Sequence, residues 1–282
     1  MKTETEQMEK KLKKTACSIR KNIIQMLTES KSGHSGGSLS AVDILTSLYF
    51  YKMDYRPAEP DWPERDRFVL SKGHAAPALY AVLAEAGYFL KEELKTLRKL
   101  GTRLQGHPDR RKLPGIEAST GSLGQGISIA CGIALCGKHI DKKDYRVYSL
   151  LGDGENQEGE VWEAAMSAAH YKLDNLCAVL DYNGLQIDGF VKDVMNIDPI
   201  ADKWRAFGWN VIEVDGHNIK ELIKALDDAE KIKGRPSMII AKTIKGKGIS
   251  FMEGKAKYHG LAPTYEECEK GLCELDDYEK NI

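Results

Sequence analysis

Two short polar motifs follow apolar, strand-like segments, and together they could bind a divalent cation. Gly152-Asp153-Gly154 follows the run Val147–Leu151, and Asn183-Gly184 stands just beyond Leu176–Leu180. Glycine in these turns lets backbone and ligand approach closely, and a helix beginning near Glu158 would direct free N–H groups to the same place. A hard divalent cation takes about six oxygens and often shares them with phosphate. A carboxylate, an amide oxygen, a backbone carbonyl after the asparagine and a diphosphate would supply most of them.

Other interpretations of these glycine turns fit the sequence less well. A lone Gly-Asp-Gly is more often an ordinary strand-end turn, but the second motif after the next strand argues against that interpretation here. A dinucleotide-binding turn needs Gly-x-Gly-x-x-Gly between a strand and a helix. The nearest candidate, residues 121–126, has different spacing and no strand before it, and a Gly-Lys-Ser/Thr phosphate loop is absent.

Histidines beside glycines form a second signal. His34, His74, His107 and His259 each adjoin a glycine in a predicted loop. Imidazoles in such loops can hydrogen-bond a polar ligand or move protons near neutral pH. Each one alone is equally consistent with a structural role, but four together favour a polyhydroxy or phosphate-bearing substrate. The remaining three lie near helix ends or in a turn and are interpreted as structural: His139, His170 and His217.

The elements that must position these groups alternate between strand and helix. The predicted strands are Arg67–Leu70, Val147–Leu151, Leu176–Leu180, Val211–Val214 and Met238–Ala241. The predicted helices between them are Leu123–His139, Glu160–Tyr171 and Asn218–Ile232, the last with a capping-box start. This alternation predicts an α/β fold with a parallel sheet flanked by helices on both faces. Ligands of such sheets bind at the carboxyl ends of the strands, where the glycine turns lie.

The two ends of the chain differ in character. The opening segment has a helical apolar face, and Ser40–Tyr51 is also predicted to be helical. The tail over residues 264–282 is acidic and has little helical or strand patterning, so we expect a surface extension or a segment that packs on another chain. Residues 1–263 are expected to form one domain. The apolar face of the opening helix consists of Met8, Leu12, Ala16, Ile19, Ile23 and Met26.

Composition excludes several classes of partner. The 282 residues include 41 Lys+Arg and 42 Asp+Glu, so charge gives no reason to expect nucleic acid or an anionic membrane as a partner. The sequence has no apolar stretch of the roughly 20 residues that a membrane span needs, and the charged N-terminus does not resemble a secretory signal. The 6 cysteines include no C-x-x-C pair. Together these features predict a soluble, cytoplasmic protein.

Taken in order, the motifs resemble those of transketolase, from about Gly33 to Pro263. Gly-Asp-Gly alone occurs in every thiamine diphosphate enzyme, but the combination is specific. It consists of Ser71-Lys72-Gly73-His74, Gln105-Gly106-His107-Pro108, Thr120-Gly121-Ser122-Leu123-Gly124-Gln125-Gly126, the segment from Gly152-Asp153-Gly154 through Glu158-Gly159, Asp181-Tyr182-Asn183-Gly184-Leu185-Gln186-Ile187-Asp188-Gly189 and Tyr258-His259-Gly260.

The resemblance implies a transfer of a two-carbon ketol unit from a ketose phosphate to an aldose phosphate, dependent on thiamine diphosphate and Mg²⁺, for which Ca²⁺ or Mn²⁺ could substitute. It implies that Asp153, Asn183 and the carbonyl of Leu185 ligate the metal, and that Ile187 packs near the thiazolium. Glu158 would lie at an interface between subunits, between two cofactor sites. The residues implied along the diphosphate are Gly121, Ser122, Leu123, Gly154 and Glu155. Gly152, His74 and His259 complete the cofactor-binding set, and the substrate-channel residues are His34, His74, His107 and His259.

The chain departs from the family pattern in sequence and in length. Ser35 and Ser122 replace prolines of two family motifs, which leaves the substrate open. Full transketolases continue into a second α/β domain that holds the aminopyrimidine ring and supplies a carboxylic acid to it. The resemblance therefore implies the N-terminal subunit of a split transketolase. Such a chain would form an α2β2 heterotetramer with a complementary C-terminal subunit, and only this assembly would act on sugar phosphates.

Three alternatives remain open at this point. The chain could be a subunit of another thiamine diphosphate enzyme, similar to 1-deoxy-xylulose-phosphate synthase or to a 2-oxo-acid dehydrogenase. It could also be a non-catalytic scaffold that keeps the fold, although an intact Asp153 and Asn183 argue against that. The motifs around His107 and His259 favour transketolase among these.

Overall fold

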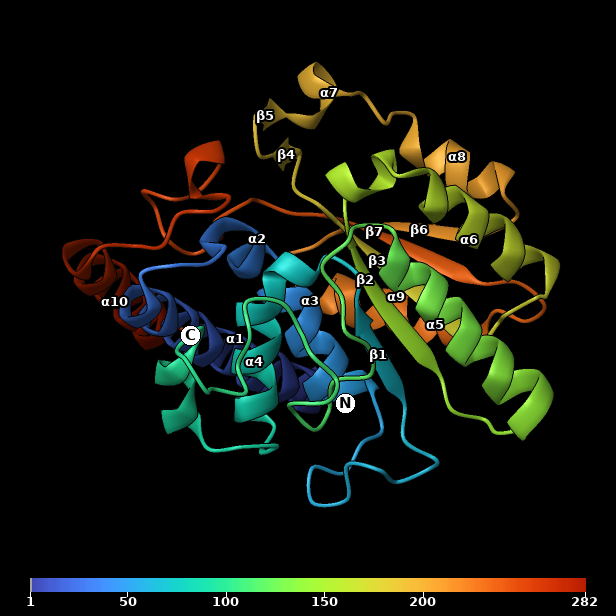
Figure 1. Ribbon diagram of the computed structural model, residues 1–282, viewed down its shortest axis with the longest axis horizontal. Helices are drawn as coiled ribbons and strands as arrows, with labels where there is room; N and C mark the ends of the chain where they lie inside the picture. The colour runs from blue at the N-terminus through green and yellow to red at the C-terminus, as the bar shows by residue number, and fades with distance from the viewer. Residues whose placement is uncertain (1) are drawn as a thin grey trace.

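The computed structural model describes residues 2–282, and its centre is a five-stranded sheet (Figure 1). All neighbouring strand pairs in this sheet are parallel. The predicted parallel α/β fold is confirmed, and every predicted strand is present with small shifts at its ends. In spatial order the strands are β1 (Arg67–Leu70), β2 (Val147–Gly152), β3 (Leu176–Tyr182), β7 (Ser237–Lys242) and β6 (Asn210–Asp215).

The carboxyl ends of β2 and β3 lie level with each other. Gly152 pairs with Asp181 in their register, so the turn that contains Asp153 lies beside the end of β3. All residues of β2 are buried, because parallel strands with both faces covered lie in the interior along their whole length. The sheet thereby brings the two predicted metal-binding motifs to one edge.

Helices cover both faces of the sheet, and strand residues alternate between two apolar cores. Tyr148 and Leu150 of β2 belong to one core, whereas Val147 and Leu151 belong to the other, because successive strand side chains point to opposite faces. The helices of the first core include α1 (Lys2–Ser30), α3 (Val42–Ser47), α4 (Ala76–Glu85) and α9 (Ile219–Lys231). Those of the second are α5 (Gln125–Leu135), α6 (Gly159–His170) and α8 (Ile200–Ala206).

Shorter elements extend or connect these. The predicted helix over Ser40–Tyr51 consists of α2 (Ser35–Ser40), α3 and a π-helical turn over Leu48–Lys52. The helix α5 begins two residues later than predicted and continues into a π-helical turn at Cys136–Asp141. The hairpin of β4 and β5 was not predicted. The other short elements are β4 (Leu185–Gln186), β5 (Gly189–Phe190), α7 (Val191–Val194) and 3₁₀ turns at Gly73–Ala75, Lys91–Thr96, Gly154–Gln157 and Ala256–Tyr258.

The N-cap of α9 is partly as predicted. The Asn218 side chain accepts hydrogen bonds from the backbone N–H groups of Lys220 and Glu221. The Glu221 carboxylate, however, accepts from the backbone N–H of Asp215 and from the Asn218 side-chain amide instead of the Asn218 backbone. Half of the expected capping box is therefore present.

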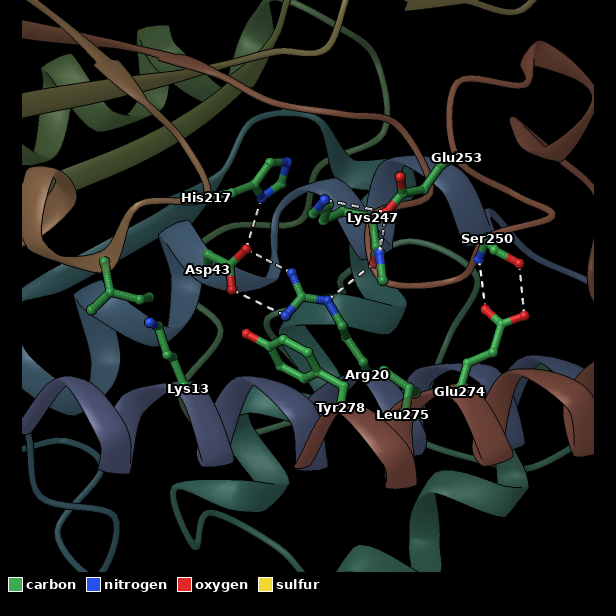
Figure 2. A pocket seen from close by; sticks show the side chains of 12 residues that line it. Lys13, Arg20, Asp43, His217, Lys247, Ser250, Glu253, Glu274, Leu275 and Tyr278 are labelled. Carbon is green, nitrogen blue, oxygen red and sulfur yellow. Dashed lines mark hydrogen bonds and ion pairs between the residues drawn. The ribbon is translucent and has the colours of Figure 1, made fainter. Parts of the chain in front are cut away.

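The acidic tail forms a helix, so the prediction that it has little regular structure is wrong. Residues Tyr265–Lys280 form the helix α10, and a capping box of Thr264 and Glu267 lies at its N-terminus. This helix packs along α1, with Leu275 buried and its carbonyl accepting a hydrogen bond from the Cys17 thiol. The two helices also border a cavity of about 300 Å³ (Figure 2). A division of the chain at residue 263 remains a prediction.

The predicted apolar face of α1 is largely buried. Leu12, Ala16, Ile19, Ile23 and Met26 lie in the interior, whereas Met8 is exposed. All six cysteines are free thiols. Over residues 2–282, every helix is too short or too polar to span a bilayer.

Candidate cofactor and metal site

A cavity of about 280 Å³ opens at the carboxyl edge of the sheet. Among its lining residues are Asp153 and Asn183, which follow the ends of the adjacent strands β2 and β3. Of the residues predicted to form the site, only Ser122 and His107 do not line the cavity, and His107 lies beside it, with its ring centroid 6.3 Å from that of His34. The predicted residues thus gather in one place, while their individual roles remain predictions.

Asp153 joins the two strand ends directly. Its buried carboxylate accepts a hydrogen bond from the Gly154 N–H at 2.8 Å, and another from the Gly184 N–H, next to Asn183. The Asn183 side-chain oxygen accepts from the Leu185 N–H at 3.1 Å. The Asp153 carboxylate and the Asn183 side-chain amide therefore belong to the lining of the same cavity.

The Asp153 carboxylate fits a cation. Burial and the nearby Asp181 raise the pKa of Asp153 to about 6, and within residues 2–282 no lysine or arginine forms an ion pair with it. A divalent cation would compensate this buried charge, and carboxylate, amide and carbonyl oxygens are the ligands that Mg²⁺ prefers. The third predicted ligand, the Leu185 carbonyl, accepts a hydrogen bond from the Lys245 ammonium at 2.9 Å. A carbonyl oxygen has two lone pairs, so this bond leaves one for a metal.

Glu155 binds neighbouring turns together. Its buried carboxylate accepts hydrogen bonds from the Ser71 hydroxyl and from the N–H groups of Gly124 and Gly152. These donors come from three segments that border the cavity. Its side chain therefore fixes the loop after residue 120 against the ends of β1 and β2.

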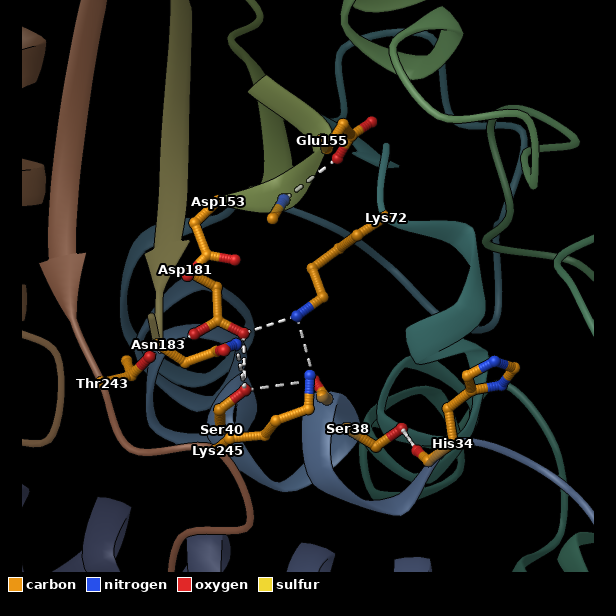
Figure 3. Close-up of polar contacts among 12 residues, drawn as sticks. His34, Ser38, Ser40, Lys72, Asp153, Glu155, Asp181, Asn183, Thr243 and Lys245 are labelled. Atoms are coloured by element: carbon orange, nitrogen blue, oxygen red, sulfur yellow. Dashed lines mark hydrogen bonds and ion pairs between the residues drawn. The ribbon is translucent and has the colours of Figure 1, made fainter. Parts of the chain in front are cut away.

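A buried ion pair of Lys72 and Asp181 borders the cavity (Figure 3). The Lys72 ammonium lies 2.5 Å from an Asp181 carboxylate oxygen, and the two side chains are 1% and 0% exposed. Asp181 also accepts hydrogen bonds from the hydroxyls of Ser40 and Thr243. Lys72 lines the cavity and lies within a motif that resembles transketolase, yet it is absent from the predicted site residues.

Lys245 is a second cation missing from the predicted set. Its ammonium lies between the Leu185 carbonyl and His259 Nδ1, 2.9 Å from each. Burial, with a contribution from the nearby Lys72, lowers the pKa of Lys245 to about 8. Figure 3 shows the Lys72 side chain reaching toward the Asp181 carboxylate. The cavity lining therefore contains two lysines, of which Lys72 is paired with Asp181.

The four predicted channel histidines converge on this cavity. The ring centroids of His34 and His74 are 5.2 Å apart, and His259 lies 5.4 Å from His34 and 5.2 Å from His74. Burial, followed by nearby cations, lowers the pKa of His34 to about 4 and that of His259 to about 3, and it also lowers the pKa of His74 and His107. All four rings are therefore neutral at neutral pH, where they can donate one hydrogen bond and accept another.

Arg98 lies near the outer histidines. Its guanidinium donates to the Ser32 hydroxyl at 2.9 Å, and its charge contributes to the lowered pKa of His34 and His107. It follows the 3₁₀ turn at Lys91–Thr96 in a left-handed conformation, with a φ of 59°. The sequence alone offered no signal for this placement, because the segment has no motif at a strand end.

Curated proteins of similar length are close in sequence. The 6-deoxy-6-sulfo-D-fructose transketolase subunit SqwG of Clostridium sp. (strain MSTE9) is 49% identical over 258 residues, which cover 92% of this chain and 94% of that protein. An apulose-4-phosphate transketolase subunit of Phocaeicola vulgatus is 43% identical over 258 residues, covering 92% and 91%. Transketolase of Homo sapiens is 49% identical over 249 residues, but these cover 88% of this chain and 39% of the human protein.

Solved structures agree with this relationship. Transketolase of Campylobacter jejuni superposes with a TM-score of 0.87 at 36% identity, covering 96% of this chain and 43% of that one. A transketolase variant from Pichia stipitis gives 0.88 at 30% identity, covering 96% and 45%. Residues 11–272 match the thiamine diphosphate binding domain of transketolase. The chain therefore belongs to the transketolase family, as its motifs predicted.

Proposed function

We propose that the chain is the N-terminal subunit of a split transketolase, which transfers a two-carbon ketol unit between sugar phosphates once a complementary subunit has joined it as α2β2. The main support is the buried Asp153 carboxylate, which lies at the carboxyl edge of the sheet, bonded to the turn that contains Asn183. The two relatives of similar length are named as transketolase subunits, whereas this chain spans 39% of the human enzyme.

The cofactor would be held by its charged end. Asp153, Asn183 and the Leu185 carbonyl would ligate Mg²⁺, and N–H groups around Gly121 and Gly154 would bind the diphosphate. Lys72 and Lys245 would add positive charge to the same cavity. Thiamine diphosphate, when bound, supplies a nucleophilic carbon and an electron sink for breaking the carbon–carbon bond of the ketose.

The histidines would form hydrogen bonds with the sugar hydroxyls. His34, His74 and His259 surround the cavity as neutral rings, so each offers one donor and one acceptor. A neutral imidazole can accept a hydroxyl proton as the carbonyl of the sugar forms. We assign the carboxylic acid that the pyrimidine ring requires to the complementary subunit, and we place Glu158 near that subunit.

The sugar has two candidates. Pentose phosphates are the default for the family, with xylulose 5-phosphate as donor and ribose 5-phosphate as acceptor. A sulfonated ketose is the second candidate, because the relative named for 6-deoxy-6-sulfo-D-fructose shares 49% identity across 94% of its length. The pentose phosphates and the sulfonated ketose all carry an anionic group at the end remote from the carbonyl.

An activity assay with one and two chains tests this proposal. The purified chain with thiamine diphosphate and Mg²⁺ is offered both ketoses, with ribose 5-phosphate as acceptor, first alone and then with the complementary subunit. We expect ketol transfer only from the two-chain assembly. Transfer by the single chain would refute the split enzyme. A parallel assay offers pyruvate and an aldehyde, and turnover of these instead of the ketoses would indicate a 1-deoxy-xylulose-phosphate synthase-like enzyme. Binding of the cofactor without any turnover would favour a scaffold.

A further inference from the structure

Two buried side chains, Arg20 and Asp43, and the partly buried His217 form a network outside the cofactor cavity. Arg20 on α1 donates to both carboxylate oxygens of Asp43 on α3, at 3.0 and 2.6 Å, and His217 Nδ1 lies 2.7 Å from the same carboxylate. Arg20 and Asp43 are 5% and 7% exposed. Figure 2 shows this trio, called the Asp43 network below, in the wall of the cavity beside α10. None of the three lines the cofactor cavity.

The outer bonds of the network end on the backbone of one loop. His217 Nε2 accepts a hydrogen bond from the Ile244 N–H at 2.8 Å, which places the ring proton on Nδ1, where it is donated to Asp43. Arg20 Nε donates to the Lys247 carbonyl at 3.1 Å. The network therefore holds the loop after β7 at two points, one on each side of Lys245.

Lys245 connects this loop to the cofactor cavity. Its ammonium donates to the Leu185 carbonyl, a predicted metal ligand, and contacts His259. The next residue, Gly246, donates its N–H to the Gly36 carbonyl at 3.0 Å. The loop has little freedom there, because a side chain at Gly246, with a φ of 82°, would lie 2.5 Å from the Met252 carbonyl oxygen.

The contacts of the Asp43 carboxylate determine its charge. Burial alone would raise the pKa of Asp43, but the Arg20 guanidinium and the His217 hydrogen bond lower it to about 2. The carboxylate is thus ionised at physiological pH, paired with a guanidinium and a neutral ring. The proposed reaction does not use these three side chains, which line a separate cavity.

We propose that Asp43 is a positioning residue for the cofactor site: through His217 and Arg20 it fixes the backbone on both sides of Lys245, and so fixes the Lys245 ammonium at the Leu185 carbonyl. This inference rests on the proposed function, because it gives Lys245 a task in cofactor binding. A purely structural role would instead confine the effect of Asp43 to the stability of the fold.

The position of the loop is tested without any cofactor. Amide hydrogen exchange is measured on the full chain and on Asp43→Asn, with Asp174→Asn as the matched control. The Asp174 carboxylate also accepts hydrogen bonds from a lysine, Lys138, and from a backbone N–H. It lies just before β3, at the amino ends of the strands and away from the cofactor cavity. We expect residues 244–247 to exchange about tenfold faster in Asp43→Asn only. Unchanged exchange of this loop in Asp43→Asn would overturn the proposal.

Two substitutions of His217 separate positioning from stability. His217→Gln keeps an acceptor for the Ile244 N–H at the position of Nε2. His217→Asn keeps a donor toward Asp43 but loses the hydrogen bond from the Ile244 N–H. Thiamine diphosphate binding with Mg²⁺ is measured by calorimetry on the two-chain assembly. We expect Gln to retain affinity within about threefold and Asn to weaken it about tenfold. The reverse order, or equal losses that follow the melting temperatures, would overturn the proposal.

A double variant shows whether Asp43 acts through Lys245. If it does, Asp43→Asn weakens cofactor binding in the normal chain but adds less than about twofold in a Lys245→Met background. Additive losses would contradict the proposed route. Should the unmodified assembly fail to bind the cofactor at all, the proposed function is refuted, and the exchange experiment still decides whether the Asp43 network positions the loop.

Discussion

Replacement of Lys72 by methionine is expected to lower the free energy of unfolding, because it breaks the buried ion pair at the cofactor cavity. The change keeps most of the side-chain length and removes the ammonium that lies 2.5 Å from Asp181. Asp181, which is 0% exposed, then keeps only hydroxyl donors, those of Ser40 and Thr243. A full negative charge would remain in the interior without an ion-pair partner.

The expected loss is large because the pair is fully buried. Breaking such a pair by removing one partner costs about 3–5 kcal/mol, out of the roughly 5–15 kcal/mol that stabilises a typical domain. Burial raises the pKa of Asp181, but Lys72 and the hydroxyls of Ser40 and Thr243 together outweigh that effect and lower the pKa. Without Lys72 the folded-state pKa rises above the unfolded value of about 3.9, so the folded protein gains a proton first. The loss is therefore greatest at neutral pH and shrinks as the pH falls toward that value.

Urea unfolding of the full chain at pH 7.5 and pH 5 measures this loss. Lys280→Met is the control, because its pair with Asp277 is fully exposed to solvent and is expected to contribute little to stability. A double variant, Lys72→Met with Asp181→Asn, should recover more than half of the stability, since it removes the uncompensated charge. A loss below about 1 kcal/mol, or one that grows at pH 5, would refute the reasoning.

Three further predictions concern packing, capping and pH. Gly126→Ala should destabilise the fold by about 1–3 kcal/mol in urea unfolding, because its Cβ would lie 2.4 Å from the Ser71 Cα; an unchanged midpoint would contradict this. Thr264→Ala should cost about 1 kcal/mol, since the hydroxyl caps α10 through the Glu267 N–H, and Thr264→Ser should restore it. Asp43, whose pKa is about 2 in the folded chain, should contribute about 2–3 kcal/mol that is present above pH 4 and lost toward pH 2; unfolding measured across this range should show a shallower acid loss for Asp43→Asn.

The fold was largely predictable because its central strands are buried on both faces. Such strands appear in the sequence as short continuous apolar runs, and β2 and β3 are both of this kind. The acidic tail was misjudged because few apolar residues mark its buried face, such as Leu275 against α1. Its capping box, Thr264 with Glu267, is the local signal that indicates a helix.

The site was predictable where its residues lie in turns at strand ends. Asp153 and Asn183 follow adjacent parallel strands, so strand geometry alone places them together. Lys72 and Lys245 escaped prediction as site residues because a lysine is most often solvated. Their burial depends on tertiary contacts, with Lys72 bonded to Asp181, 109 residues away, and Lys245 to Leu185, 60 residues away.

The histidines illustrate how burial changes a prediction. From sequence, imidazoles beside glycines were expected to transfer protons near neutral pH. In the folded chain, burial and neighbouring cations lower the pKa of His34 to about 4 and that of His259 to about 3. Before a ligand binds, they are therefore neutral hydrogen-bonding groups and weak bases.

Calorimetric titration of the two-chain assembly with thiamine diphosphate, with and without Mg²⁺, tests the central claim most directly. The claim is that Asp153 and Asn183, at two adjacent strand ends, hold a metal that anchors the diphosphate. We predict binding that requires Mg²⁺ and that weakens at least about tenfold in Asp153→Ala, while His107→Ala, at the edge of the cavity, leaves it nearly unchanged. Binding that is indifferent to Mg²⁺, or equal losses from the two substitutions, would contradict the claim.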